Sequence, residues 1–329
     1  MNYFVTGATG FIGGVVVLQL REAGHGVVAL VRNPQKAGAL AALGVTLAQG
    51  DVTDRESLRL PMTGVDGVFH IAGWYKLGVL GEERKQGYAI NVEGTCNVLE
   101  VMRELGIPKG VYTSTIAINS DTKGKLVNEQ YRYDGSHLTE YDRTKWLAHW
   151  RIAEPMTKAG LPLVTVMPGV VYGPEDTSNI GGTFRDYLQR RFPLIPTATY
   201  CWAHVEDTAR AHLLAMEKGR VGESYIVAGP VHTLAEALDT VATITGIPAS
   251  RIRLPGVMIK ATAALTSVVE KVLPLPEIYR SETLRSSAGV SYIGDNRKAR
   301  EELGFNPRPL HEGLTTTLAY EMAKLGLKQ

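Results

Sequence analysis

The chain has 329 residues, of which 44% are hydrophobic, so it can bury a large core in one large domain or two lobes. With 35 basic and 33 acidic residues its formal net charge is +2, which gives no reason to expect binding to nucleic acid or to a membrane surface. Its two cysteines, Cys96 and Cys201, show no metal-ligand spacing and fit a reducing compartment. We therefore predict a cytoplasmic protein without a metal site.

An apolar strand at the N-terminus runs directly into glycines at positions 7, 10 and 13. Gly7 would allow a tight turn with positive φ, Gly10 would let the backbone approach a pyrophosphate, and Gly13 would let the following helix pack closely on the strand. The helix expected over Ile12–Ala23 then directs its free N–H groups and the positive end of its dipole at the anion. The spacing G-x-x-G-x-x-G is one residue longer than the usual G-x-G-x-x-G, but its mechanism predicts the same dinucleotide-binding loop.

The next strand indicates which dinucleotide binds. Residues Val27–Val31 are all apolar, as in a strand buried on both faces of a parallel sheet, and Arg32 follows directly. About 20 residues after the glycines, an acidic side chain would bind the ribose of NAD, whereas arginine accommodates the 2′-phosphate of NADP. Since no Asp or Glu lies between Glu22 and Asp51, the sequence favours NADP(H) over NAD(H).

Apolar strands alternate with helical stretches through the first two-thirds of the chain. Further buried strands are expected at Val45–Gln49, Gly67–Ala72, Gly110–Thr115, Leu163–Met167 and Ser224–Ala228, and helices near 86–105, 140–160 and 202–219. This alternation predicts an α/β fold of Rossmann type, in which a doubly wound parallel sheet carries a smaller C-terminal substrate lobe. We assign residues 1–169 and about 200–229 to the nucleotide-binding domain, and about 170–199 and 230–329 to the lobe.

Tyr141 and Lys145 lie four residues apart at the start of the helix after the fifth strand, so they share one helix face. An ammonium group beside a phenol favours the phenolate and lowers its pKa, and such a tyrosine can exchange a proton with a carbonyl or alcohol oxygen. The same spacing recurs at Tyr320 and Lys324, but nothing places that pair near a strand end, so we interpret it as a surface pair. A hydroxyl of Tyr112–Thr115 upstream could hold the substrate oxygen.

The most apolar segment of the second half is Val257–Leu273. It carries Lys260, Glu270 and Lys271, and it is too short and too interrupted to span a bilayer. We predict an amphipathic helix that covers an apolar surface.

Together these motifs resemble the extended short-chain dehydrogenases/reductases of the NAD-dependent epimerase/dehydratase superfamily, and the resemblance covers nearly the whole chain. It rests on Thr6–Gly13, Gly50–Val52, Asn91–Thr95, Tyr112–Thr115, Tyr141 with Lys145, Pro168–Pro174 and Ala203–Asp207. The resemblance implies that Tyr141 is the catalytic acid/base and that Lys145 is its partner. It places the catalytic hydroxyl on Thr115, with Ser114 as the alternative if the loop is shifted by one residue.

The resemblance also implies that Asp51 and Val52 hold the adenine. The full set of residues that we expect at the cofactor is Gly7, Thr9, Gly10, Phe11, Ile12, Gly13, Arg32, Asp51, Val52, Ile71, Ala72, Gly73, Thr113, Tyr141, Lys145, Pro168, Val170 and Val171. Three other polar residues are given supporting roles. His70 is interpreted as a structural strand histidine, Asn91 as a ligand of a backbone carbonyl or water behind Tyr141, and Asp207 as a helix-start residue.

Within the family, Val31–Pro34 is most similar to the dihydroflavonol reductase-like branch, which implies an NADPH-dependent carbonyl reductase acting on a small molecule. Thr115 is followed by Ile116 and Ala117 instead of the Asp-Glu of sugar dehydratases, which disfavours dehydration. The alternatives are a non-catalytic NADP-binding sensor and a nucleotide-sugar epimerase. The epimerase would hold a diphosphate with arginines of the lobe: Arg185, Arg190, Arg191, Arg251 and Arg280.

An apolar or aromatic substrate would stack on aromatic residues after the strands or in the lobe, namely Trp74, Tyr75, Tyr133, Tyr172, Phe184 and Tyr187. The resemblance further implies a homodimer formed through the helices near 86–105 and 140–160.

Overall fold

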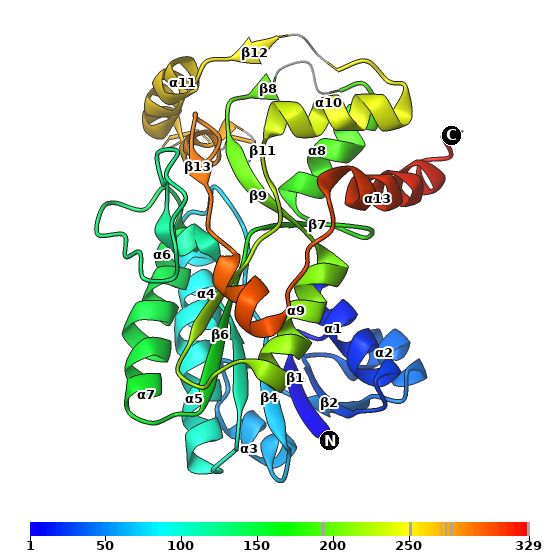
Figure 1. The fold of residues 1–329 in the computed structure, drawn as a ribbon. Helices are drawn as coiled ribbons and strands as arrows, with labels where there is room; N and C mark the ends of the chain where they lie inside the picture. The colour runs from blue at the N-terminus through cyan, green and yellow to red at the C-terminus, as the bar shows by residue number, and fades with distance from the viewer. Residues whose placement is uncertain (192–194, 250–251, 271, 274, 277–278, 328–329) are drawn as a thin grey trace.

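A parallel sheet of seven strands forms the centre of the molecule (Figure 1). The structure is a computed structural model, and it describes residues 1–327 except 192–194, 250–251, 271, 274 and 277–278. The strands lie in the order β10-β6-β5-β4-β1-β2-β3 and all pair in parallel. They are β1 (Asn2–Thr6), β2 (Gly26–Val31), β3 (Thr46–Gln49), β4 (Gly67–His70), β5 (Gly110–Thr113), β6 (Leu163–Pro168) and β10 (Ser224–Val227). The predicted Rossmann-type sheet is confirmed, and its strand order reverses beside β1.

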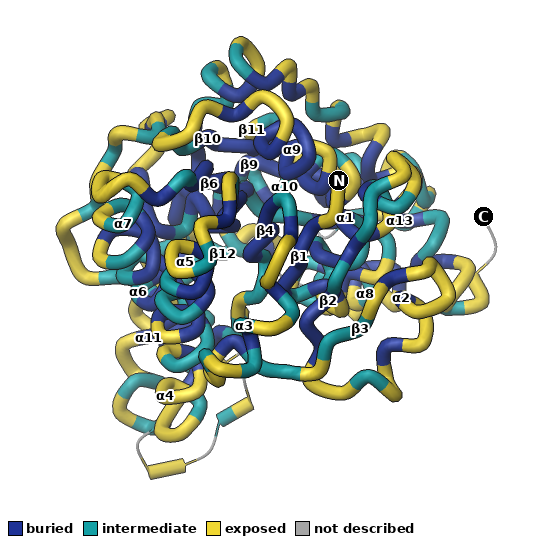
Figure 2. Tube along the Cα trace, turned by 90° about the horizontal axis from the view of Figure 1, so that it is seen from below, coloured by how far each residue is buried: buried dark blue, intermediate teal, exposed yellow. Residues whose placement is uncertain are grey.

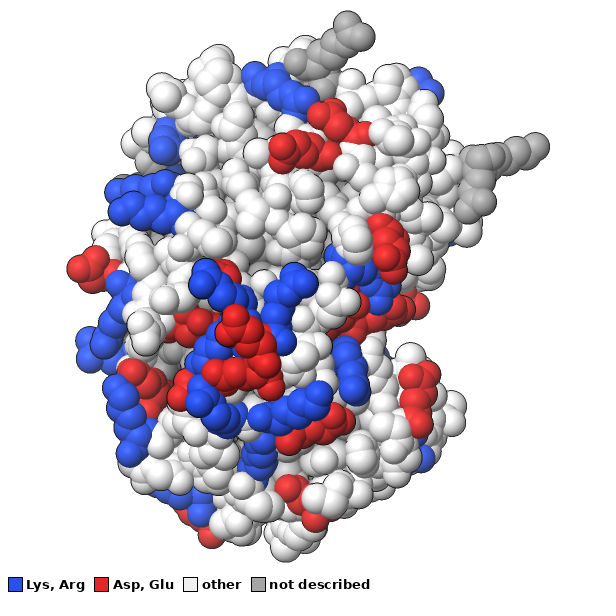
Figure 3. Space-filling model, viewed as in Figure 1, with Lys and Arg blue, Asp and Glu red and all other residues white. Residues whose placement is uncertain are grey.

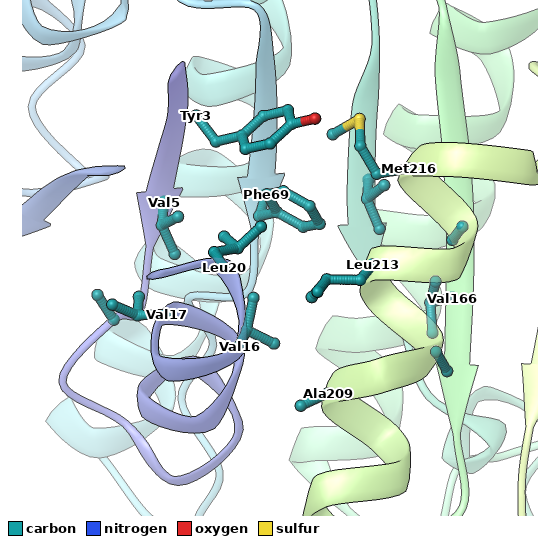
Figure 4. Packing of buried hydrophobic residues seen from close by; sticks show 14 of the residues in the cluster. Tyr3, Val5, Val16, Val17, Leu20, Phe69, Val166, Ala209, Leu213 and Met216 are labelled. Carbon is teal, nitrogen blue, oxygen red and sulfur yellow. The ribbon is translucent and has the colours of Figure 1, made fainter. Parts of the chain in front are cut away.

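Helices cover both faces of the sheet, because successive strand residues point to opposite sides. On β1, Tyr3 and Val5 belong to the core on one face, whereas Phe4 belongs to the core on the other. Figure 4 shows the first core, between α1 and α9, and Figure 2 shows buried strands inside a more exposed shell of helices. The first face carries α1 (Phe11–Glu22), α2 (Gly38–Ala42) and α9 (Val205–Lys218); the second carries α3 (Glu56–Met62), α5 (Gly94–Glu104), α6 (Glu140–Leu147) and α7 (Glu154–Lys158).

Two long helices of the second face each contain a π-helical stretch. One runs from α4 (Glu82–Tyr88) through π-helical Ala89–Glu93 into α5. The other runs from α6 through π-helical Ala148–Ala153 into α7. π-helical turns are rare and often occur at functional sites, so both helices are candidates for carrying functional side chains.

A smaller lobe lies at the carboxyl ends of the strands (Figure 1). Its central strand β9 (Thr199–His204) pairs with three others, and a separate pair joins β8 to β12. The remaining elements of the lobe are β7 (Val170–Tyr172), β8 (Ile195–Pro196), β11 (Val231–Thr233), β12 (Arg253–Leu254), β13 (Ser291–Tyr292), α8 (Asn179–Leu188), α10 (Leu234–Thr245), α11 (Gly256–Val269), α12 (Ser281–Arg285) and α13 (Leu310–Lys324).

Two expectations are corrected by these elements. The helix predicted over 202–219 begins only at Val205, because the preceding residues form β9 and the His204 side chain accepts the Glu206 N–H at 3.3 Å as an N-cap. The helix predicted within Val257–Leu273 exists as α11, but it buries only Ile259 and Ala263. Among the residues that the structure describes, no helix combines the length and apolarity needed to cross a bilayer.

Candidate active site

The glycine loop after β1 is shaped by two close contacts. Gly7 has a φ of +75°, and a Cβ built there would lie 2.6 Å from the Ala72 nitrogen. A Cβ at Gly13 would lie 2.0 Å from the Gly7 carbonyl oxygen, which no side chain tolerates. The first glycine therefore brings the loop against the end of β4, and the third brings α1 against the loop.

The start of α1 is a suitable place for an anion. Its N-cap is the exposed Gly10, no side chain caps the helix, and its first turn contains no acidic residue. The free N–H groups and the dipole of such a helix end favour a phosphate. This end lies at the point where the strand order reverses, between β1 and β4, which is where doubly wound sheets bind nucleotides.

The predicted adenine-side residues follow β2 and β3. Arg32 is exposed at the end of β2, and its guanidinium makes no hydrogen bond or ion pair with any residue that the structure describes. The Asp51 carboxylate accepts hydrogen bonds from the Thr53 N–H and hydroxyl at 2.9 and 2.8 Å, so it stabilises its own turn. Val52 is buried, and its methyl group leaves no room for a Cβ at Gly94. Arg32 is thus free to contact a ligand.

Tyr141 and Lys145 share one face of α6, as their spacing predicts. Thr139 begins this helix by accepting the Asp142 N–H at 3.0 Å. The Tyr141 hydroxyl lies beside the Thr115 side chain, which acts to lower its pKa. The Lys145 ammonium donates to the Thr113 carbonyl at 2.7 Å, and a Cβ at Gly73 would lie 4.0 Å from it. Three segments that are distant in sequence therefore meet at the carboxyl ends of the central strands.

The structure distinguishes Thr115 from Ser114, the two candidates for the catalytic hydroxyl. Ser114 is hydrogen-bonded to the Nδ1 atom of His149 at 2.9 Å, so it points toward the π-helical stretch. Thr115 instead contacts Tyr141 and accepts the Ala117 N–H at 3.1 Å. Of the two residues, Thr115 is the one placed beside the tyrosine.

A buried chain of polar groups supports Lys145, and sequence reasoning missed it. Lys145 donates to the Tyr112 hydroxyl at 3.3 Å, and the Thr95 side chain beside Tyr112 acts to lower the pKa of that tyrosine. The Thr95 hydroxyl lies 3.0 Å from His70 Nε2, and His70 Nδ1 lies 2.8 Å from the Thr6 hydroxyl, which accepts from the Ala72 N–H. His70 therefore has the structural role that the sequence predicted.

One assignment of protons satisfies this chain. The Thr95 hydroxyl donates to the Asn91 carbonyl at 2.7 Å, so its oxygen accepts from His70 Nε2. The Tyr112 oxygen accepts from Lys145, and His70 Nδ1 accepts from Thr6. Two of the three N–H donors of the ammonium are thereby fixed, and the third is free to reach a ligand.

Burial governs the protonation of the two central residues. It lowers the pKa of Lys145 to about 7. It raises the pKa of Tyr141 well above its ordinary value, while the Thr115 side chain acts in the opposite direction. This differs from the expected lowering by lysine, because the ammonium is directed at Thr113 and Tyr112. Tyr141 is accordingly a neutral phenol with an available proton.

Asn91 connects this site to the loop after β4. Its Oδ1 accepts the Trp74 N–H at 2.7 Å, and its Nδ2 donates to the Trp74 carbonyl and to the Thr144 hydroxyl, both at 3.0 Å. The carbonyl contact is one of the two roles expected for Asn91. It fixes the loop so that the half-exposed Tyr75 ring packs edge-on against Tyr141, with 4.8 Å between ring centroids.

Glu282 of α12 closes the site from the lobe, and nothing in the sequence indicated this role. Its buried carboxylate accepts the Val79 N–H at 3.0 Å and the Glu140 N–H at the start of α6. One side chain of the lobe therefore holds both the loop after β4 and the helix of Tyr141.

Most of the aromatic residues proposed to bind substrate have other partners. Tyr172, Phe184 and Tyr187 are buried with Trp202 in the core of the lobe. The Tyr133 hydroxyl donates to the Ser136 carbonyl at 2.8 Å, and Trp74 packs against Gly87. Of the six, Tyr75 is the one that packs against Tyr141.

The helix-start role of Asp207 includes an ion pair. Its carboxylate accepts hydrogen bonds from Nε of Arg308 at 2.9 and 3.1 Å, from Nη2 of Arg308 at 2.9 Å, and from the Arg308 backbone N–H at 3.0 Å. The pair fastens the C-terminal segment to α9. Within the described part of the chain, no group of His, Cys, Asp and Glu could hold a metal ion.

Asp142, beside Tyr141, gives a prediction for stability. Its buried carboxyl accepts a hydrogen bond from the Tyr292 hydroxyl at 3.0 Å, and burial raises its pKa from 3.8 to about 7. From about pH 4 to 7 the folded chain keeps a proton that the unfolded chain has lost. This group therefore lowers the free energy of unfolding as pH rises, by at most about 1.4 kcal/mol per pH unit.

Asp142→Asn removes this dependence. We expect the free energy of unfolding of the variant, relative to the original protein, to rise between about pH 4 and 7 and to level off above. Urea unfolding at a series of pH values measures this difference. The exposed Asp186→Asn is the control and should give a flat difference; a flat difference for Asp142→Asn would contradict the prediction.

Comparison with known proteins agrees with this geometry. Residues 3–228 match the NAD dependent epimerase/dehydratase family. The chain belongs to this family. Its members are NAD(P)-dependent oxidoreductases and epimerases of the extended short-chain dehydrogenase/reductase type, so the predicted class of enzyme and the resemblance are confirmed.

Two curated relatives match almost the whole chain. A putative dihydroflavonol 4-reductase from Synechocystis is 33% identical over 95% of this chain and 92% of its own length. Sterol demethylase protein B from Methylococcus capsulatus is 29% identical over 97% of this chain and 98% of its own. Among solved structures, gox2253 is 28% identical and superposes with a TM-score of 0.85 over 99% of both chains.

Proposed function

We propose that this family member is an NADPH-dependent reductase of a ketone or aldehyde on a small apolar substrate. The observation that carries the proposal is the Tyr141 phenol, which lies beside the Thr115 hydroxyl and a buried lysine. These groups lie at the carboxyl ends of the strands, where the glycine loop also lies. Two hydroxyl groups that share one site can bind the same carbonyl oxygen.

The residues around this pair fit a dinucleotide. The loop Gly7–Gly13 and the start of α1 would hold the pyrophosphate, Arg32 the 2′-phosphate, and Asp51 with Val52 the adenine. The free third N–H of Lys145, beside Gly73, would reach the nicotinamide ribose. When bound, the reduced nicotinamide supplies the hydride.

Side chains of the protein then supply and direct the proton. Thr115 donates a hydrogen bond that orients the carbonyl oxygen, and Tyr141 transfers its phenolic proton to that oxygen. Because burial keeps Tyr141 neutral, the proton is present before the reaction. Lys145, whose ammonium is directed at Thr113 and Tyr112, contributes by positioning the nicotinamide ribose.

The nature of the substrate is inferred from the site wall and from the relatives. Tyr75 presents an exposed aromatic ring beside Tyr141, and aromatic rings bind flat apolar molecules well. The names of the two relatives refer to a dihydroflavonol and to a sterol. Both names support an apolar, ring-containing ketone.

The epimerase alternative is less well supported by the arginines of the lobe. Arg185 donates to the Asp176 carbonyl and pairs with Glu321, and Arg280 donates to the Gly78 and Leu275 carbonyls. Arg251 lies outside the described residues, which leaves Arg190 and Arg191 for a diphosphate. A non-catalytic sensor would not require the assembled Tyr141, Thr115 and Lys145.

The two chemistries are distinguished by the fate of the cofactor. A reductase consumes added NADPH steadily in the presence of a cyclic ketone, as followed by the absorbance of reduced nicotinamide. An epimerase instead retains its nicotinamide through gel filtration and shows no net consumption. Binding without turnover across a panel of ketones and aldehydes, with either cofactor, would contradict the reductase and support the sensor.

Arg32→Asp tests the cofactor preference. The change removes a charge-assisted contact to the 2′-phosphate, worth roughly 1.5–3 kcal/mol, and adds repulsion between like charges. We expect NADPH affinity to fall at least about tenfold while NADH affinity stays level or rises. Fluorescence titration measures both, and the exposed Arg103→Asp should leave both unchanged. An equal loss of affinity for NADPH and NADH would contradict the proposed preference for NADP.

A further inference from the structure

Helix α11 leaves an apolar face uncovered at the end of the molecule farthest from the sheet (Figure 1). Its side chains Val257, Leu265 and Val268 are 79%, 67% and 64% exposed. Beyond the helix, Val272, Leu273 and Tyr279 are also exposed. Scattered exposed apolar residues are ordinary on protein surfaces, but a continuous group of them marks an interaction site.

The spacing of these residues makes one continuous stripe. At 100° per residue, positions 257, 258, 261, 264, 265 and 268 fall within an arc of roughly 120°. The buried Ile259 and Ala263 lie on the other side, where α11 packs against α12. The helix is therefore apolar on two faces, and the lobe covers only one of them.

The charged residue that borders the stripe is a lysine. Lys260 is the only charged residue of α11; it is exposed and borders the apolar arc. Lys260 forms no ion pair with any described part of the chain. The nearest acid in sequence, Glu270, is held by the Ser281 hydroxyl at 2.6 Å. In the view of Figure 3, basic residues lie below α11, and the acidic residues of the lobe lie toward α10.

Helix α11 by itself is too small for a stable protein–protein interface. A helix of 14 residues is about 21 Å long and about 10 Å wide, so the face it presents is on the order of 200 Å² in projection. Stable interfaces bury about 800 Å² on each partner. A convex apolar helix bordered by a lysine fits instead the interface of a bilayer with anionic lipids.

We propose that α11 docks the protein on an anionic membrane surface, with Val257, Met258, Leu265 and Val268 entering the acyl boundary and Lys260 contacting lipid headgroups. The overall charge of the chain does not predict this surface, because a sum over all residues conceals a local arrangement. The proposal does not depend on the reaction. The position of α11 has a consequence for substrate access. Helix α12 contacts α11 and carries Glu282, which holds the loop at the rim of the site.

Vesicle co-sedimentation tests the proposal with the full chain. We expect binding to phosphatidylcholine vesicles that contain phosphatidylglycerol, weaker binding to phosphatidylcholine alone, and a loss at high salt. The double variant Leu265→Glu/Val268→Glu should weaken binding at least about tenfold. Lys260→Glu should reduce the preference for the anionic vesicles.

The matched control places two glutamates on exposed apolar positions elsewhere, Leu60→Glu/Val221→Glu, and should bind vesicles as the original protein does. All variants should keep their activity on a water-soluble substrate. Failure of the original protein to bind either kind of vesicle would overturn the proposal, as would equal losses in the control. A dimer in sedimentation equilibrium that Leu265→Glu/Val268→Glu abolishes would also overturn it, because the face would then join two copies of the chain.

Discussion

Tyr141→Phe is expected to lower kcat for ketone reduction by about 10²–10⁴-fold, the usual contribution of a positioned proton donor. The change removes one oxygen atom and leaves the ring, so its edge-on contact with Tyr75 remains. The Kd for NADPH should stay within about twofold, because the phosphate-binding loop and Lys145 are untouched. Steady-state kinetics and fluorescence titration of NADPH measure the two effects separately.

The chain contains its own control for this experiment. Tyr320 and Lys324 repeat the spacing of Tyr141 and Lys145 on α13, where the lysine lies 5.6 Å from the ring centroid of its tyrosine. Tyr320→Phe should leave both kcat and Kd unchanged. If Tyr141→Phe retained most of its activity, the proton donor would have to be another group and the proposed mechanism would be wrong.

Gly13→Ala is expected to damage both stability and cofactor binding. The new Cβ would lie 2.0 Å from the Gly7 carbonyl oxygen and 2.7 Å from the Gly7 carbonyl carbon, both backbone atoms, so the loop must move. Overpacking of this kind costs about 1–3 kcal/mol or more. Because the displaced backbone forms the anion site, NADPH affinity should fall more than about tenfold. Urea unfolding and fluorescence titration measure the two losses.

The neighbouring glycine provides the comparison. A Cβ at Gly14 would lie 3.6 Å from the Ala8 oxygen, an ordinary contact, in the same first turns of α1. Gly14→Ala should therefore stabilise the protein by about 0.5–1 kcal/mol, as alanine does in a helix interior, and leave NADPH affinity unchanged. Equal behaviour of the two variants would show that close packing at Gly13 is unimportant.

The fold was predictable because its signals are local. Apolar runs such as Val27–Val31 identify the buried strands, and the glycines after β1 identify the loop through their conformational freedom and lack of a side chain. The helix predicted from residue 202 failed for a non-local reason. Residues 199–204 pair with strands that precede them and strands that follow them in the sequence, and no local pattern encodes such pairing.

The site was predictable only in part, for the same reason. Tyr141, Lys145 and the hydroxyl-rich end of β5 could be found by spacing and resemblance. The partners that position them could not, because they come from other segments. Tyr112 is a buried strand residue by its pattern, and its contacts with Lys145 and Thr95 exist only in the folded chain. Glu282 lies more than 140 residues from Glu140, and its sequence context carries no motif.

The π-helical stretches in the two long helices have a consequence for insertions and deletions. A π-turn contains one residue more than an α-turn, so it rotates everything beyond it by roughly 100° relative to a regular α-helix. Asn91 and His149 both lie inside such stretches. Deleting one residue at either place would restore a regular helix and turn the following side chains to a different face. Length is therefore as strictly constrained in these two helices as residue identity.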